Sequence, residues 1–172
     1  MKAGLVTMGM AVLAGLVHAN FDIYQVQDNQ SWDSQASFQW MMFENDPDCG
    51  QVMDSHDMYR VLDSEDVSHD SGVVCEPPDQ CYYWNNPSNV NRLEMNFLAA
   101  DRARFHWTIY KNRNWDMIGL DGNVYGNCIP FPNHDIQCSR GLWSVGGKRM
   151  FRCLTRFTVY DFIAANGGRT VG

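Results

Sequence analysis

Apolar and polar residues alternate with a period of two along two neighbouring stretches of this chain, residues 93–98 and 105–110. Such alternation predicts β-strands that turn one face to a core and the other to solvent. Because the linker between the stretches is short, we expect them to form an antiparallel hairpin. The apolar face would consist of Leu93, Met95, Phe97, Phe105, Trp107 and Ile109.

Other β-prone stretches and turn signals extend this pattern over most of the chain. The stretches are residues 21–26, 36–46, 56–63 and 72–76. Asp121-Gly122 is the signature of a two-residue hairpin turn, and Gly146-Gly147 is expected at the tip of a third hairpin. One helical turn is expected over residues 161–168, where glycines would stop it. The sequence therefore predicts a mainly β fold, an antiparallel sandwich or barrel with little helix.

The beginning of the chain has the layout of a secretory signal peptide. One lysine precedes an apolar run over residues 3–17, and the small residues Val17 and Ala19 fit a cleavage site. The run is short for a membrane helix, and no later segment is long and apolar enough to span a bilayer. We therefore expect cleavage after Ala19 and one secreted, extracellular domain over residues 20–172. In such a protein the sequon at Asn29 is a candidate glycosylation site.

All six cysteines follow the expected cleavage site: Cys49, Cys75, Cys81, Cys128, Cys138 and Cys153. An even number in an exported chain indicates three disulfides, although six cysteines allow fifteen pairings and the sequence does not choose among them. Short loops favour the pairs 75–81 and 128–138 as a first guess, which leaves 49 with 153. The paired C-x₂₋₄-C spacing of zinc ribbons is absent, so no metal site is expected.

The charge is distributed unevenly along the chain, whose formal net charge is −7. Residues 20–82 hold fourteen acidic side chains and one basic side chain, whereas residues 83–172 hold six acidic and eleven basic ones. Such asymmetry can mark an acidic tail or a basic binding face. Since both parts contain strand-like stretches, we favour the simpler interpretation that they pack together and neutralise each other.

The polar face of the first hairpin gathers side chains that could perform acid–base chemistry. If the turn lies midway along the linker, Asn96 faces His106 and Glu94 faces Thr108, so Glu94 and His106 become diagonal neighbours. With Arg104 on the same face, this group resembles the Glu, His and Arg set of the small secreted fungal ribonucleases. The resemblance implies hydrolysis of a phosphodiester by Glu94, Arg104 and His106. No second catalytic histidine is evident.

A second resemblance lies in "IYKNRNWD" (residues 109–116), which is similar to the first strand of a βγ-crystallin motif. "DIQCS" (residues 135–139) resembles the calcium loop of that family, with Cys138 where a hydroxyl residue is usual. The expected glycine after Trp115 is replaced by Met117. The resemblance implies a toxin or a protease inhibitor.

Aromatic residues supply the best candidates for a binding surface. "CYYWNNP" follows two prolines and places three aromatic side chains in a loop beside a cysteine, where they could stack on sugars or bases. Gly-rich phosphate loops, G-x-S-x-G elbows and H-E-x-x-H motifs are absent from the sequence, so no cofactor is expected. The candidate binding residues are Tyr82, Tyr83, Trp84, Tyr110 and Trp115.

The signal peptide, the β-rich domain and the six cysteines together resemble the small secreted cysteine-rich proteins of filamentous fungi. That class implies a non-enzymatic effector- or toxin-like protein that binds a host protein or a cell-wall glycan. A nucleic-acid partner and a membrane span are not expected, and the sequence leaves the oligomeric state open. The ribonuclease-like hydrolase and the βγ-crystallin-like toxin or inhibitor remain as alternatives.

Overall fold

The computed structural model describes residues 19–30, 37–54, 59–62, 67–68, 71–97 and 105–165, with only the backbone of residues 19, 30 and 59–62. The predicted signal peptide before Ala19 and the candidate catalytic residue Arg104 lie outside the described residues. No helix of the described part of the chain is long and apolar enough to span a membrane.

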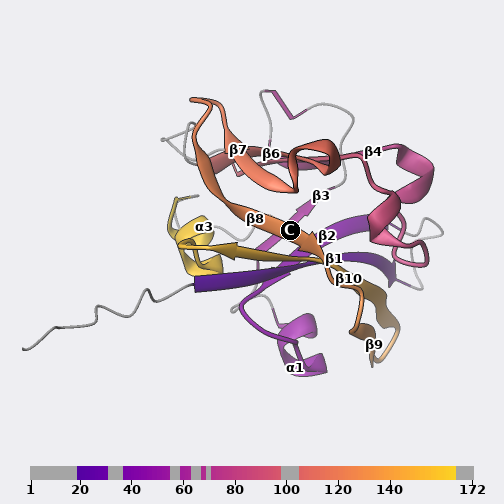
Figure 1. Cartoon of the computed structure of the whole chain (residues 1–172). Coiled ribbons are helices and arrows are strands. Elements are labelled where there is room, and N and C mark those ends of the chain that lie inside the picture. The colour runs from indigo at the N-terminus through magenta and orange to yellow at the C-terminus, as the bar shows by residue number, and fades with distance from the viewer. Residues whose placement is uncertain are drawn as a thin grey trace, which may run out of the picture.

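The protein is mainly antiparallel β, as the alternating pattern predicts. The strands are β1 (Ala19–Gln30), β2 (Ser37–Phe43), β3 (Tyr59–Leu62), β4 (Gly72–Glu76), β5 (Arg92–Asn96), β6 (His106–Tyr110), β7 (Asp116–Gly119), β8 (Val124–Pro130), β9 (Asp135–Arg140) and β10 (Trp143–Thr155). They form one ten-stranded sheet in the order β3-β2-β1-β10-β8-β7-β6-β5-β4, and β9 pairs with β10. Because the edge strands β3 and β4 contact each other, the sheet is a nearly closed barrel (Figure 1).

Short helical segments complete the fold. They are the α-helices α1 (Cys49–Met53) and α3 (Val159–Ala165) and the 3₁₀ turns η1 (Pro78–Gln80), η2 (Pro87–Asn89) and η3 (Lys111–Arg113). The helical turn predicted near the C-terminus is therefore present, although it begins two residues earlier. Thr158 and Asp161 start α3 with reciprocal hydrogen bonds, in which each side chain accepts from the backbone N–H of the other.

The helix α3 lies at one end of the barrel (Figure 1), and the buried core beside it is rich in aromatic residues. Phe162 of α3 packs with ring centroids 4.6 Å from Phe97 and 4.9 Å from Phe21, and Trp107 is fully buried beside it. A second apolar cluster lies on the outer face of β1 and β2, where α1 and β9 cover it with Val52 and Ile136. Since β1 is covered on both faces, seven of its ten described side chains are buried and the other three are half-buried.

A β-bulge in β10 places two arginines on one face of the sheet. The register between β1 and β10 shifts after Ile23, and Met150 is the extra residue. Arg149 therefore lies opposite Tyr24, while Arg152 lies opposite Asp22. Residues 22 and 24 share a face of β1, so the two arginines also share that face although they are three positions apart.

The Asp-Gly hairpin exists, but its turn differs from the prediction. The N–H of Gly122 donates to the carbonyl of Gly119 at 2.9 Å, so Leu120 and Asp121 occupy the centre of the turn. Gly122 follows in the left-handed region with a φ of 78°. The connection is thus a three-residue loop, in which glycine supplies the positive φ that closes the hairpin.

The prediction of a hairpin tip at Gly146-Gly147 is wrong, because β10 runs straight through both glycines. The chain turns instead at Gly141, which has a φ of 61°, and Leu142, between the paired residues Arg140 and Trp143. A Cβ at Gly147 would lie 2.6 Å from the carbonyl oxygen of Gln25. Glycine here permits the close approach of β1 rather than a turn.

Three disulfides are present, but two of the guessed pairings are wrong. Cys75–Cys81 is confirmed. Cys49 pairs with Cys138, which ties α1 to β9, and Cys128 pairs with Cys153 across β8 and β10. The guess failed because β9 pairs with β10 and lies against α1, which places Cys138 away from Cys128. Cys128 instead lies directly opposite Cys153 in the β8–β10 pair.

Candidate functional site

The segment between β4 and β5, residues 77–90, is held rigidly although it contains little regular structure. Cys81 is bonded to Cys75 at its start, and η1 and η2 form two tight turns within it. The side chain of Asn89 donates to Gln80, which links the two turns. The backbone N–H of Tyr83 donates at 2.8 Å to the side chain of Gln25, which is 2 % exposed. The segment is therefore fixed to β1 before any ligand arrives.

This rigid segment and β2 together form an aromatic platform, which consists of Phe38, Tyr82, Tyr83 and Trp84. The rings of Tyr82 and Trp84 stack with centroids 4.6 Å apart and an interplanar angle of 10°. Phe38 of β2 meets Tyr82 edge-on at 4.9 Å, and Tyr83 meets Trp84 edge-on at 5.0 Å. Trp84 nevertheless remains 55 % exposed. An exposed tryptophan among packed rings offers a large contact surface at low entropic cost.

A groove runs between the platform and the β9–β10 hairpin. It has a volume of about 400 Å³ and is lined by Tyr83, Trp84, Asp135, Ile136, Gln137, Gly147 and Lys148. A carboxylate, an amide and an ammonium group thus face two aromatic rings across a space of ligand size. The ammonium group of Lys148 lies 4.0 Å from the carboxylate of Asp135. Such a lining can stack on the apolar face of a sugar ring while it hydrogen-bonds the hydroxyl groups.

The other two candidate binding aromatics lie elsewhere. Trp115 is half-buried, and its ring packs 5.5 Å from that of Phe151 in the core. Tyr110 lies at the end of β6, where the guanidinium of Arg113 is 4.9 Å from the centre of its ring. The sequence thus identified three of the four platform residues but missed Phe38, whose pairing with the loop depends on the position of β2.

The prediction that Glu94 and His106 are diagonal neighbours is confirmed. The register pairs Asn96 with His106 and Glu94 with Thr108, and His106 Nε2 lies 2.7 Å from Glu94 Oε1. The imidazole is 4 % exposed. Arg92, which the sequence analysis did not single out, lies 3.9 Å from the other oxygen of Glu94.

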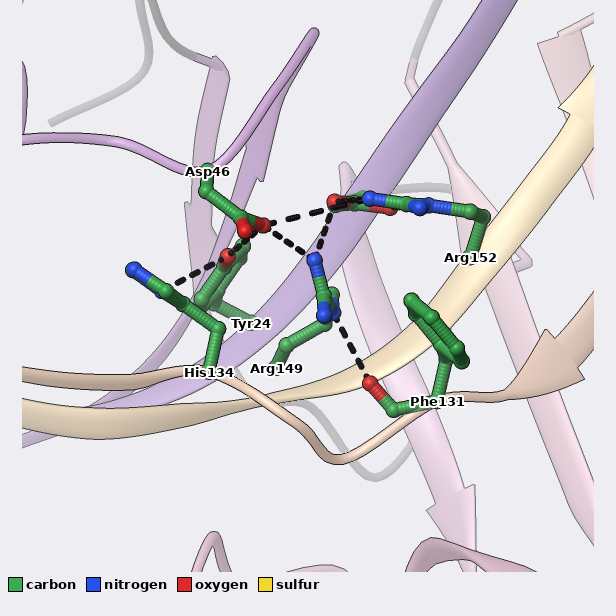
Figure 2. Close-up of polar contacts among 7 residues, drawn as sticks. Tyr24, Asp46, Phe131, His134, Arg149 and Arg152 are labelled. Carbon is green, nitrogen blue, oxygen red and sulfur yellow. Dashed lines mark hydrogen bonds and ion pairs between the residues drawn. The ribbon is translucent and has the colours of Figure 1, made fainter.

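A polar cluster that the sequence analysis missed surrounds Arg149 on the outer face of β1 and β10 (Figure 2). We call it the Arg149 cluster; its members are Asp22, Tyr24, Asp46, Phe131, His134, Arg149 and Arg152. Arg152 donates two hydrogen bonds of 2.7 Å to Asp22, and Arg149 donates to Asp22, to Asp46 and to the carbonyl of Phe131. Both guanidinium groups lie over the ring of Phe131, at 4.4 Å and 4.6 Å.

The acids of the Arg149 cluster come from the acidic part of the chain and its arginines from the basic part. Together with the Arg140–Asp54 pair, these contacts show that acidic side chains of the first part pair with basic side chains of the second. Hydrogen bonds to Asp22 raise the pKa of Arg152. Burial, and then the charge of Asp46, raise the pKa of Tyr24, so its hydroxyl remains protonated and bonded to Asp46 and His134. Because its groups satisfy one another, the cluster holds the fold together.

The segment that resembles a calcium loop, residues 135–139, lies within β9. It is extended and paired with β10, and Cys138 within it forms a disulfide. In the described part of the chain, no group of histidine, cysteine and acidic residues is arranged to hold a metal ion. The candidate glycosylation residue Asn29 is half-buried near the end of β1, opposite Ser144.

Comparisons of the chain with protein-family models, with curated proteins and with solved structures found no match. The functional argument therefore depends on the geometry described above.

Proposed function

We propose that this protein is an extracellular binding protein that recognises a cell-wall glycan through the aromatic platform and the adjoining groove. The observation that carries the proposal is the stacked, half-exposed Trp84 on a loop fixed by the Cys75–Cys81 disulfide. A sugar ring gains contact with such a surface without the cost of ordering the loop. Polar side chains along one wall of the groove would supply hydrogen bonds to hydroxyl groups.

A glycan fits this surface better than a folded protein partner. The groove of about 400 Å³ is the size of a small-molecule site and mixes aromatic with polar side chains. A stable protein interface buries on the order of 800 Å² on each partner, usually around a central apolar core. The three disulfides and the signal-peptide pattern favour an oxidising, extracellular location, as in the secreted fungal effectors that the sequence resembles.

The proposal is tested by retention of the purified, oxidised protein on insoluble chitin, cellulose and β-1,3-glucan. We expect Trp84→Ala to weaken retention by at least about ten-fold, since aromatic anchors of this kind typically contribute 2 kcal/mol or more. Tyr160→Ala is the matched control, because Tyr160 is 56 % exposed against 55 % for Trp84 but lies on α3. Equal retention of the two variants, or no retention of the native protein, would contradict the proposal.

A second candidate function, a ribonuclease-like hydrolase, is favoured by the 2.7 Å contact between Glu94 and His106. A carboxylate that holds an imidazole in place is a common acid–base pair. Under the binding proposal we expect no cleavage of RNA by the purified protein. Cleavage that disappears in His106→Ala, with an unchanged melting curve, would establish this second function instead.

A further inference from the structure

A second pocket lies at the base of the loop that presents the aromatic platform. It has a volume of about 520 Å³ and is lined by Glu76, Asn91, Arg92, Tyr110, Lys111 and Asn112. The N–H of Asn91 donates to the carbonyl of Glu76 at 2.6 Å, which closes the base of the loop. Among the described residues, none lines both this pocket and the groove beside Trp84.

The basic residues at this pocket differ from most others in the protein. The structure describes eight basic side chains, and five of them, residues 92, 140, 148, 149 and 152, form ion pairs with carboxylates. Among the described residues, Lys111, Arg113 and Arg156 form none. Lys111 and Arg113 both belong to η3, and Arg113 lies over Tyr110, which lines the pocket. Of these two unpaired cations, Lys111 lines the pocket and Arg113 lies on Tyr110 beside it, in a protein whose net charge is −7.

The local charge indicates which anion the pocket would accept. Arg92 is paired with Glu76 at 2.7 Å and lies 3.9 Å from Glu94, so these three groups leave one negative charge. Lys111 and Arg113 add two positive charges, so the neighbourhood carries a net charge of about +1. A monoanionic carboxylate would neutralise it, whereas a phosphate dianion would be repelled by Glu76 and Glu94.

We propose that this pocket binds an acidic sugar, with Lys111 as the ligand of its carboxylate and Arg113 as a second positive charge beside it. The volume suits a single sugar ring, and the amides of Asn91 and Asn112 can exchange hydrogen bonds with hydroxyl groups. Tyr110 supplies an apolar wall. The proposal goes beyond the function of the aromatic groove and uses different residues, so either site can fail without the other.

The test is a titration of the native protein with galacturonic acid and with its methyl ester, which has the same ring but no charge. We expect the acid to bind at least about ten-fold more tightly, a difference of 1.4 kcal/mol. The double variant Lys111→Gln/Arg113→Gln should lose most of this difference. Arg156→Gln, which removes an unpaired cation away from the pocket, should bind the acid within about two-fold of the native protein.

Three outcomes would overturn the inference. They are equal affinity for acid and ester, an equal loss of binding in Arg156→Gln, and tighter binding of inorganic phosphate or of an RNA oligonucleotide than of the acid. Trp84→Ala should leave binding of the acid unchanged, and a loss there would assign the sugar to the groove and also overturn the inference. The native protein could fail to be retained on the polysaccharides of the preceding test while its binding of the acid still depends on Lys111 and Arg113. In that case only the proposal for the aromatic groove fails.

Discussion

The Arg149 cluster and the surface around residues 77–90 use similar side chains in opposite ways. In the cluster, Arg149 is 2 % exposed and its hydrogen-bonding groups are taken up by Asp22, Asp46 and the backbone. Around residues 77–90, Trp84 is 55 % exposed and Lys111 has no carboxylate partner among the described residues. The comparison indicates that arginine, tyrosine and acidic residues mark a binding site only where contacts within the chain leave some of their charges or hydrogen-bonding groups unpaired.

Two of the disulfides should contribute differently to stability and to binding, and their removal should give the largest effects. In the chain-entropy model, loss of Cys49–Cys138, which closes 89 residues, costs about 4–5 kcal/mol, whereas loss of Cys75–Cys81, which closes 6 residues, costs about 2 kcal/mol. We expect the order to reverse for glycan retention because, of these two bridges, the short one lies in the segment that presents the aromatic platform. Urea unfolding and polysaccharide retention of the two paired Cys→Ser variants measure both. Weaker retention in the Cys49/Cys138 variant than in the Cys75/Cys81 variant would contradict this.

Removal of a charge from the Arg149 cluster should be the next largest effect. Asp22→Asn leaves the buried Arg149 without one of its two carboxylate partners, and we expect a loss of about 3–4 kcal/mol. Asp54→Asn is the matched control, since Asp54 pairs with Arg140 on the surface. The control should leave the urea midpoint unchanged. If both variants unfold at the same urea concentration, the Arg149 cluster does not stabilise the fold as described.

A smaller effect is expected from single hydroxyl groups in the two regions. Tyr24→Phe removes a hydroxyl that lies 3.2 Å from Asp46 and 3.0 Å from His134, and should cost about 1–2 kcal/mol. Tyr82→Phe keeps the stacked ring of the platform and should change the free energy of unfolding by less than about 0.5 kcal/mol. Thermal and urea unfolding of the two variants measures whether a hydroxyl group contributes to stability only where it is buried.

The smallest expected effect is a dependence of stability on pH through Glu44, which lies outside both regions and accepts a hydrogen bond from the N–H of Val159. Burial raises the pKa of Glu44 above its ordinary 4.5, and hydrogen bonds from the backbone of Val159 and Tyr160 offset this only in part. The folded protein therefore holds this proton more tightly than the unfolded chain. Its stabilising contribution is complete below pH 4.5 and is lost as pH rises through the raised pKa. Glu44→Gln should flatten this slope in melting temperature, and an unchanged slope would assign it to other groups.

Local patterns in the sequence predicted the fold class and one set of contacts correctly. Alternation over residues 93–98 and 105–110, together with a turn placed midway along the linker, predicted the register of β5 and β6 and made Glu94 and His106 diagonal neighbours. Alternation helps because a shift by one residue would turn the apolar face to solvent. "CYYWNNP" indicated the aromatic loop because its prolines and cysteine are themselves local signals.

Features that depend on distant pairings were missed. The Arg149 cluster brings together residues more than a hundred positions apart, and it requires a bulge at Met150 that no local pattern marks. The partner of Cys138 was guessed wrongly because it depends on how β9 packs against α1. The sequence analysis did not single out Lys111 and Arg113, since only the structure shows which basic residues have acidic partners.

The most direct test of the glycan-binding proposal is an NMR titration of the native protein with soluble oligosaccharides of the polysaccharide on which the protein is retained. The indole N–H signals of Trp84 and Trp107 report on an exposed and a fully buried ring of one molecule. We expect the Trp84 signal and the backbone signal of Tyr83 to shift until saturation while that of Trp107 stays in place. A ligand that binds without moving the Trp84 signal would contradict the proposed role of the aromatic platform.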